Sequence, residues 1–293
     1  MAENSFEWTG FYLFSHCFGL VPFVKSKNGK YVVSIKHSLY SLLILIIVGF
    51  LFFKSNLETA GVEIFLRGEK FLNFVFMLAN LIGYPALIII AYFFVIYRRT
   101  DICNTVNRII DLNNVLLKLK PVKFKFRDRY GLIFYYLIGT IIALFHIGKS
   151  ATGNFKEICM FAISLYEVQC NLAIDVYFSI FIFNMEMAYH RLYLCLIEKK
   201  KLKSLDYLKS LRGIHLECAD LLESVMNCFS EIVTSAVVLD FVAITGGFYC
   251  FAKFSKESPA CFLWSMAAFS RLLFKVFVFT KANKEVSQPS LIV

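Results

Sequence analysis

The chain has 293 residues, of which 58% are hydrophobic and 17% aromatic, and its formal net charge is +10. A soluble globular domain is typically about 45–50% apolar, so this composition excludes an ordinary soluble domain. The excess Lys and Arg residues lie between apolar blocks, as they do in the cytosolic loops of membrane proteins, and no soluble module carries them as a nucleic-acid-binding surface.

Six apolar blocks along the chain are long enough to cross a hydrocarbon core about 30 Å thick, which takes roughly 20 helical residues. The clearest has 27 uncharged residues between Lys70 and Arg98, with Pro85 near its middle, where a membrane helix tolerates a kink. We predict an all-α, polytopic membrane helical bundle that forms a single domain over residues 1–293. Its six spans are expected at about residues 37–53, 71–97, 130–148, 158–185, 232–252 and 258–280.

The distribution of basic residues predicts a cytosolic N-terminus. The N-terminal segment and the second and fourth loops together contain 20 Lys and Arg, whereas the other three loops contain seven. Basic residues accumulate on the cytosolic side. Residues 1–15 contain Glu3 and Glu7 and no basic stretch before an apolar core, so they do not resemble a signal peptide. This inverted orientation disfavours a conventional G-protein-coupled receptor, whose N-terminus faces outward.

The fourth loop, residues 186–231, is predicted to be a cytosolic helical extension. Apolar residues recur there at spacings of three and four over about three heptads, which indicates one face of a helix. This apolar stripe consists of Leu211, Ile214, Cys218, Leu221, Val225, Phe229 and Ile232. We expect the helix to continue into the fifth span and to pack on the inward extension of the fourth span, residues 185–197. Packing between subunits is the alternative.

No catalytic or metal-binding pattern is present, so neither an enzyme nor a cofactor is expected. The His residues lack metal-ligand spacing, and there is no nucleophile elbow, phosphate loop or paired Asp motif. The nine Cys include no C-x-x-C pair, which argues against a zinc site. Cys159, Cys250 and Cys261 fall near the predicted outer face, where one disulfide could form.

Polar residues inside the predicted spans are costly in lipid, so they usually face the bundle interior or a wet cavity. Those in the outer halves of the third to sixth spans converge on one side of the membrane, and aromatic rings with a few polar groups are typical of a small-molecule site. The candidate ligand-binding residues are His146, Tyr166, Glu167, Gln169, Asn171, Asp240, Thr245, Tyr249 and Trp264. Each could instead make a structural hydrogen bond between helices.

Three further charged residues in the spans are assigned structural roles. Asp175 is expected to contact a neighbouring helix deep in the membrane. Arg271 and Lys275 are four residues apart, hence on one helical face, and both are expected to extend toward the inner headgroups.

Several segments carry a family resemblance: Phe18 to Phe23 before the first span, Ser38 to Ser41, Arg98 to Leu116, and Ile214 to Phe229. With the loop lengths and the inverted topology, they resemble the insect gustatory receptors, a branch of the insect chemoreceptor superfamily. The resemblance implies seven spans and a ligand-gated cation channel in the plasma membrane of chemosensory neurons, assembled as a homo- or hetero-tetramer. The family's seventh-helix signature, Thr-Tyr followed by Gln-Phe, is absent from this sequence, which ends at Val293; without that helix, pore formation is in doubt.

The leading hypothesis is therefore a gustatory chemoreceptor. A small tastant would bind from outside among the third to sixth helices and favour the open pore, which requires tighter binding to the open than to the closed state. The alternatives are a nonconducting regulatory subunit or truncated product that binds full-length relatives, and a small-solute transporter, for which the expected internal repeats are not found. The expected partners are a small-molecule tastant, the lipid bilayer and related receptors; nucleic acid is not one of them.

Overall fold

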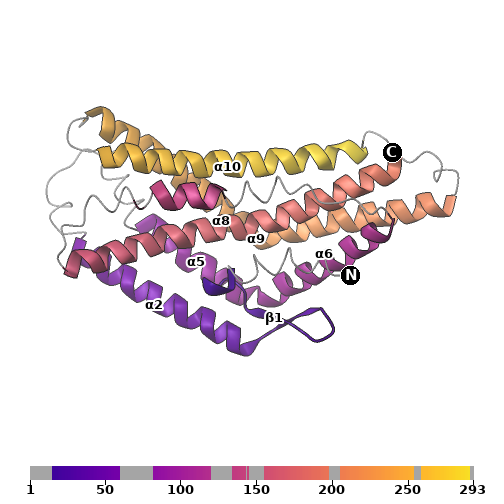
Figure 1. The fold of residues 1–293 in the computed structure, drawn as a ribbon, viewed down its shortest axis with the longest axis horizontal. Helices are drawn as coiled ribbons and strands as arrows, with labels where there is room; N and C mark the ends of the chain where they lie inside the picture. The colour runs from indigo at the N-terminus through magenta and orange to yellow at the C-terminus, as the bar shows by residue number, and fades with distance from the viewer. Residues whose placement is uncertain are drawn as a thin grey trace.

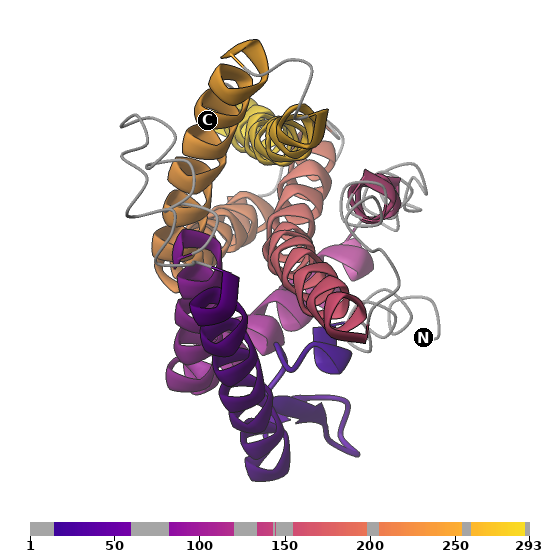
Figure 2. The same cartoon turned by 90° about the vertical axis from the view of Figure 1, so that its left-hand side faces the viewer.

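The computed structural model describes residues 15–59, 82–119, 134–142, 144, 155–197, 205–253 and 259–290. The strands β1 (Phe23–Lys25) and β2 (Tyr31–Val33) precede the long helices (Figure 1), and residues 134–142 form a further helical segment. The long helices are α2 (Ile35–Thr59), α5 (Tyr84–Tyr97), α6 (Arg99–Leu119), α8 (Phe155–Ile197), α9 (Leu205–Lys253) and α10 (Pro259–Ser290). Helices α8, α9 and α10 pack on one another, and α2, α5 and α6 lie on the opposite side of α8 and α9 from α10 (Figure 2).

Two helices are far longer than the membrane is thick. Helix α8 has 43 residues and α9 has 49, so at 1.5 Å per residue they are about 65 and 74 Å long. Residues 165–197 and 206–249 are long and apolar enough to cross a membrane, and Ile35–Leu51 and Tyr84–Tyr97 are shorter apolar helices. A hydrocarbon core takes only about 30 Å, so a span in either helix would leave more than half of that helix outside the core.

The exposed charged residues in the described part of α9 all lie before Ile232, where Leu216 is also 56% exposed. Asp220, Glu223 and Glu231 are exposed in its first part, whereas Val238 and Phe241 are 56% and 63% exposed further on. Charged side chains favour water and large apolar ones favour lipid. The change between Glu231 and Val238 is consistent with a span that begins near residue 232; the six span limits and the orientation stay predictions.

Large apolar side chains also lie on the outside of α2, α5 and α10. Soluble proteins rarely expose contiguous apolar patches of this kind, and here they form a surface suited to lipid. Residues of this surface include Leu39, Leu43, Ile46 and Phe50 on α2, Ile89 and Phe93 on α5, and Phe269, Leu273, Val276 and Phe277 on α10.

The predicted apolar stripe of α9 is buried within the chain. Its members lie in the main hydrophobic core or pack against it, and the predicted partner on α8 supplies Met185, Ala188 and Leu192 to the same core. Residues 205–253 thus form one continuous helix whose stripe packs within the chain, while the cytosolic location of residues 186–231 stays a prediction. Helix α6 is a further partner that the sequence analysis missed, because it treats residues 98–129 only as a loop; Ile102 and Val106 of α6 join this core.

The β1–β2 hairpin is held on α6 by side-chain hydrogen bonds. The Asn107 side chain donates to the carbonyl oxygen of Tyr31 and accepts from its N–H, both at 2.8 Å. Lys30 and Asp111 form an exposed ion pair at 3.1 Å. Before the hairpin, Gly19 has φ +69°, and a Cβ there would lie 2.9 Å from Ile44 Cδ1. Only glycine suits both this backbone conformation and this close approach.

Candidate functional site

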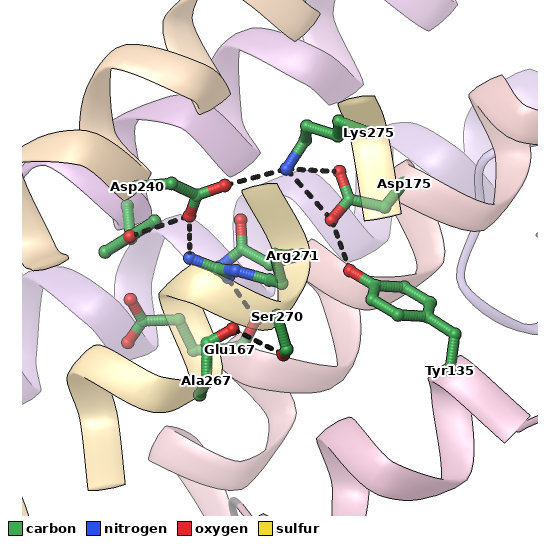
Figure 3. A network of polar contacts seen from close by, with 10 residues as sticks. Tyr135, Glu167, Asp175, Asp240, Ala267, Ser270, Arg271 and Lys275 are labelled. Carbon is green, nitrogen blue, oxygen red and sulfur yellow. Dashed lines mark hydrogen bonds and ion pairs between the residues drawn. The ribbon is translucent and has the colours of Figure 1, made fainter. Parts of the chain in front are cut away.

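Four charged residues from three helices meet inside the bundle (Figure 3). Asp175 belongs to α8, Asp240 to α9, and Arg271 and Lys275 to α10. Each is less than 9% exposed. We call these four residues the ionic cluster. Two carboxylates and two cations balance its formal charge, which matters because a lone charge buried at membrane depth is strongly unfavourable.

The two cations of α10 join it to both neighbouring helices. Lys275 Nζ lies 2.8 Å from Asp240 Oδ2 and 3.0 Å from Asp175 Oδ1, so one ammonium group bridges α8 and α9. The Arg271 guanidinium donates to Asp240 Oδ1. Its central carbon lies 4.7 Å from the ring centroid of Tyr84, within the range of a cation–π contact.

Two tyrosines extend the ionic cluster to two further elements. Tyr84 of α5 donates its hydroxyl hydrogen to Asp240 Oδ1 at 3.0 Å. Tyr135, in the helical segment 134–142, donates to Asp175 Oδ2 at 2.8 Å, and its ring stacks on Phe274 with centroids 3.9 Å apart. Each carboxylate thus accepts from a cation and from a neutral hydroxyl. Five elements meet at one charge-balanced point.

One side of Arg271 is not used by the ionic cluster. Within the described part of the chain its Nε has no hydrogen-bond partner. Glu167 of α8 interacts electrostatically with this guanidinium, and Figure 3 shows it beside Ala267 and Ser270 of α10. Glu167 lies two helical turns from Asp175, on the side that the sequence analysis assigns to the outer half of the membrane.

The structure corrects one prediction and confirms another. Arg271 and Lys275 do not extend to the headgroups: they are 8% and 5% exposed and bind carboxylates of other helices. The periodicity of α10 alone cannot show that two acids face it from α8 and α9, so the sequence analysis missed this pairing. Asp175 is a contact between helices, as predicted.

Among the candidate ligand-binding residues, Asp240 belongs to the ionic cluster and Glu167 lies beside it. Gln169 faces the segment 134–142, where it donates to Thr140 Oγ1 at 3.1 Å and accepts from the Tyr136 hydroxyl. Asn171 donates to the carbonyl oxygen of Glu167 in its own helix at 3.1 Å.

The remaining candidates are placed in several different environments. The Tyr166 ring lies against Phe18, with centroids 6.2 Å apart. Thr245 is exposed and donates to the carbonyl oxygen of Phe241 in its own helix, and Tyr249 is half-buried. His146 and the side chain of Trp264 lie outside the described residues, as do the side chains of Cys159, Cys250 and Cys261. The seven candidates whose side chains the structure describes are therefore distributed over several faces, with Glu167 and Asp240 together at the ionic cluster.

A family model described as 7tm chemosensory receptor matches residues 10–293. No curated protein matches the sequence. In the described part of the chain, no three His, Cys, Asp or Glu side chains are grouped so that they could hold a metal ion.

Proposed function

The chain belongs to the 7tm chemosensory receptor family, and from this premise we propose that it is a gustatory receptor subunit that senses small tastants from the extracellular side and gates a cation channel. Membership supports a membrane chemoreceptor for a small molecule, in a family that is generally non-enzymatic. The proposal adds the taste modality, the channel, assembly into a tetramer with related receptors, and a plasma-membrane location in insect chemosensory neurons. The observation that carries the proposal is the match over almost the whole chain.

We place the ligand on the outer side of the ionic cluster, beside Glu167. A protein of this kind needs a position where a bound molecule can alter the spacing of several helices at once. Helices α5, α8, α9 and α10 and the segment 134–142 each bring at least one side chain to the ionic cluster. Removing the partner of a buried charge costs several kcal/mol, so a ligand that shifts one of the helices α8, α9 and α10 would force the other two to follow.

Two of these contacts suit movement better than the rest. Tyr84 and Tyr135 reach the ionic cluster through neutral hydroxyls, whereas α8, α9 and α10 reach it through charged groups. Hydrogen bonds to charged groups contribute only about 1.5–3 kcal/mol, less than a broken buried ion pair costs. We therefore expect α5 and the segment 134–142 to move relative to a more rigid α8–α9–α10 unit when the receptor opens.

The test is functional expression of the chain, alone and together with related receptors, in cells that lack tastant responses. Surface biotinylation establishes that the protein reaches the plasma membrane, and whole-cell current is recorded across a broad panel of tastants. We expect at least one tastant to evoke a cation current. Surface-expressed protein that gives no evoked current in any combination would contradict the channel proposal. A current that appears only with a partner would assign this chain a supporting subunit role.

A matched pair of variants tests where the tastant binds. Glu167→Gln removes the carboxylate beside Arg271, and Glu223→Gln removes an exposed carboxylate from α9. We expect Glu167→Gln to shift the half-maximal tastant concentration by about tenfold, which corresponds to roughly 1.4 kcal/mol, with unchanged surface expression. Glu223→Gln should leave the response as it is. Equal responses for both variants would refute the position of the ligand and leave the receptor function standing.

A further inference from the structure

The hairpin and the first turn of α2 carry an exposed basic surface. Lys25, Lys27 and Lys36 are all exposed. Among the described residues none of the three forms an ion pair with a carboxylate, whereas Lys30 is paired with Asp111. The hairpin and the first turn of α2 together therefore present three ammonium groups to an anionic partner.

Exposed apolar residues lie beside these lysines. Val32 of β2 is 47% exposed, and Ile35 and Leu39 of α2 are 74% and 59% exposed. Further along α2, Leu43, Ile46 and Phe50 are also exposed. Because α2 exposes large apolar side chains from its first residue, the apolar region of the bilayer reaches close to Ile35. The hairpin ends only two residues earlier, at Val33, so it lies at the level of the headgroups.

The end of the neighbouring helix α5 is a second indication of where the headgroup level lies. Helices α2 and α5 pack on each other, and α5 ends at Tyr97, which is 74% exposed and stacks on Phe93 with centroids 6.0 Å apart. The guanidinium of Arg98 follows it and lies over Phe94. An exposed tyrosine and an arginine at the end of an apolar helix are typical of a membrane–water interface.

The basic surface is held on a rigid element. Phe23 and Tyr31 of the hairpin are 2% and 4% exposed, and Asn107 fixes the backbone of Tyr31 at both polar atoms. The turn closes at Gly29, which has φ +81°. Lysines on a fixed hairpin lose less conformational entropy on binding than lysines on a mobile tail.

We propose that the hairpin and the first turn of α2 bind the anionic phospholipid headgroups of the leaflet that they border, through Lys25, Lys27 and Lys36 and the exposed Val32 and Ile35. The ammonium groups attract headgroup phosphate and carboxylate, while the two apolar side chains enter the boundary with the acyl chains. If the N-terminus is cytosolic, as the basic residues predict, this leaflet is the anionic one. The interaction is separate from the tastant site and does not depend on it.

The experiment uses the full chain in nanodiscs of phosphatidylcholine with zero to 30% phosphatidylserine, within the composition range where a leaflet is strongly anionic (about one charge in three lipids). A bimane fluorophore is attached at Asn28→Cys, at the tip of the hairpin, in a Cys17→Ser background because Cys17 is exposed. A trace of lipid with a nitroxide on its headgroup quenches bimane on close approach. We expect quenching to rise with phosphatidylserine and to fall at high salt.

The matched variants decide whether the hairpin lysines are responsible. Lys25→Gln, Lys27→Gln and Lys36→Gln together should weaken the apparent affinity for phosphatidylserine by about fivefold for each lysine removed. The control replaces three exposed basic residues on other elements, α6 and α9: Lys118→Gln, Lys209→Gln and Arg212→Gln. All six side chains are exposed, so both variants should elute from size exclusion as the parent does.

Three outcomes would overturn the proposal. Quenching that does not depend on phosphatidylserine would show that the basic surface is not an anionic-lipid site. An equal loss in both triple variants would show that only the net charge matters. If inositol hexakisphosphate reproduced in pure phosphatidylcholine nanodiscs the spectral change that phosphatidylserine causes, the ligand would be a soluble phosphate and not a lipid.

Discussion

Replacing Asp240 by Asn is the sharpest test of the ionic cluster. Asn has nearly the same shape and can still accept from the Tyr84 hydroxyl, so the main change is one lost negative charge. The ionic cluster then holds two cations and one carboxylate. Asp240 is 1% exposed and Lys275 is 5% exposed, so water screens this imbalance very little. Removing one partner of a buried pair costs about 3–5 kcal/mol.

Thermal unfolding of the detergent-purified protein measures this cost. A shift of roughly 2–4 °C per kcal/mol in a domain of this size predicts a Tm lowered by about 6–20 °C. Glu223→Gln on the exposed face of α9 is the matched control, and its effect should stay within about 0.5 kcal/mol. Both proteins are compared at one concentration and in one detergent.

A second substitution separates charge balance from packing. Arg271 binds Asp240 and not Asp175, so adding Arg271→Met to Asp240→Asn restores neutrality and leaves the Lys275–Asp175 pair intact. We expect the double variant to regain at least half of the lost Tm. A single variant as stable as the parent, or a double variant less stable than the single one, would refute the reasoning.

Three further outcomes follow from packing and burial. Gly139→Ala should lower the Tm, because a Cβ there would lie 2.8 Å from Leu172 Cδ2 and overpacking costs about 1–3 kcal/mol. Gly213→Ala should raise it, because nothing lies within 4 Å of that Cβ and Ala in a helix is favoured by about 0.5–1 kcal/mol; a fall in Tm there would contradict the packing described. At pH 8 a maleimide should modify Cys17, which is exposed, and spare Cys218. Burial raises the pKa of the Cys218 thiol to about 12, so almost none of it is thiolate at pH 8. Peptide mapping that finds Cys218 modified first would contradict this burial.

The first half of α9 could be predicted because its sequence carries a complete helical pattern. Leu211, Cys218 and Leu221 recur at helical spacing, and the structure buries all three. Helix α6 could have been predicted from the same kind of pattern. Ile102, Val106 and Ile109 recur at spacings of four and three, and the structure buries all three. The many polar residues between these positions, such as Asn104, Asn107 and Arg108, make the pattern typical of a loop between two spans.

The ionic cluster could not be predicted from the sequence because it depends on how helices face each other. Arg271 and Lys275 share a face of α10, a fact available from spacing. Nothing in that spacing indicates whether the face meets water or carboxylates. Likewise, Asn171 and Thr245 bond to carbonyls of their own helices, a local alternative that is always open to short polar side chains. Polar residues in a span are therefore candidates for a binding site. Only the packing of the helices shows which of them face other helices and which bond to their own.

The unbroken length of α9 has a mechanical consequence. Its first 27 residues precede the predicted span as a stiff rod about 40 Å long, and no break separates them from Asp240. A tilt of about 5° in the membrane would then displace Leu205 by roughly 3 Å, by lever geometry on that rise per residue. Motions too small to open a gap between helices around Asp240 would thus be amplified at the far end of α9, where another subunit or a cytosolic protein could register them.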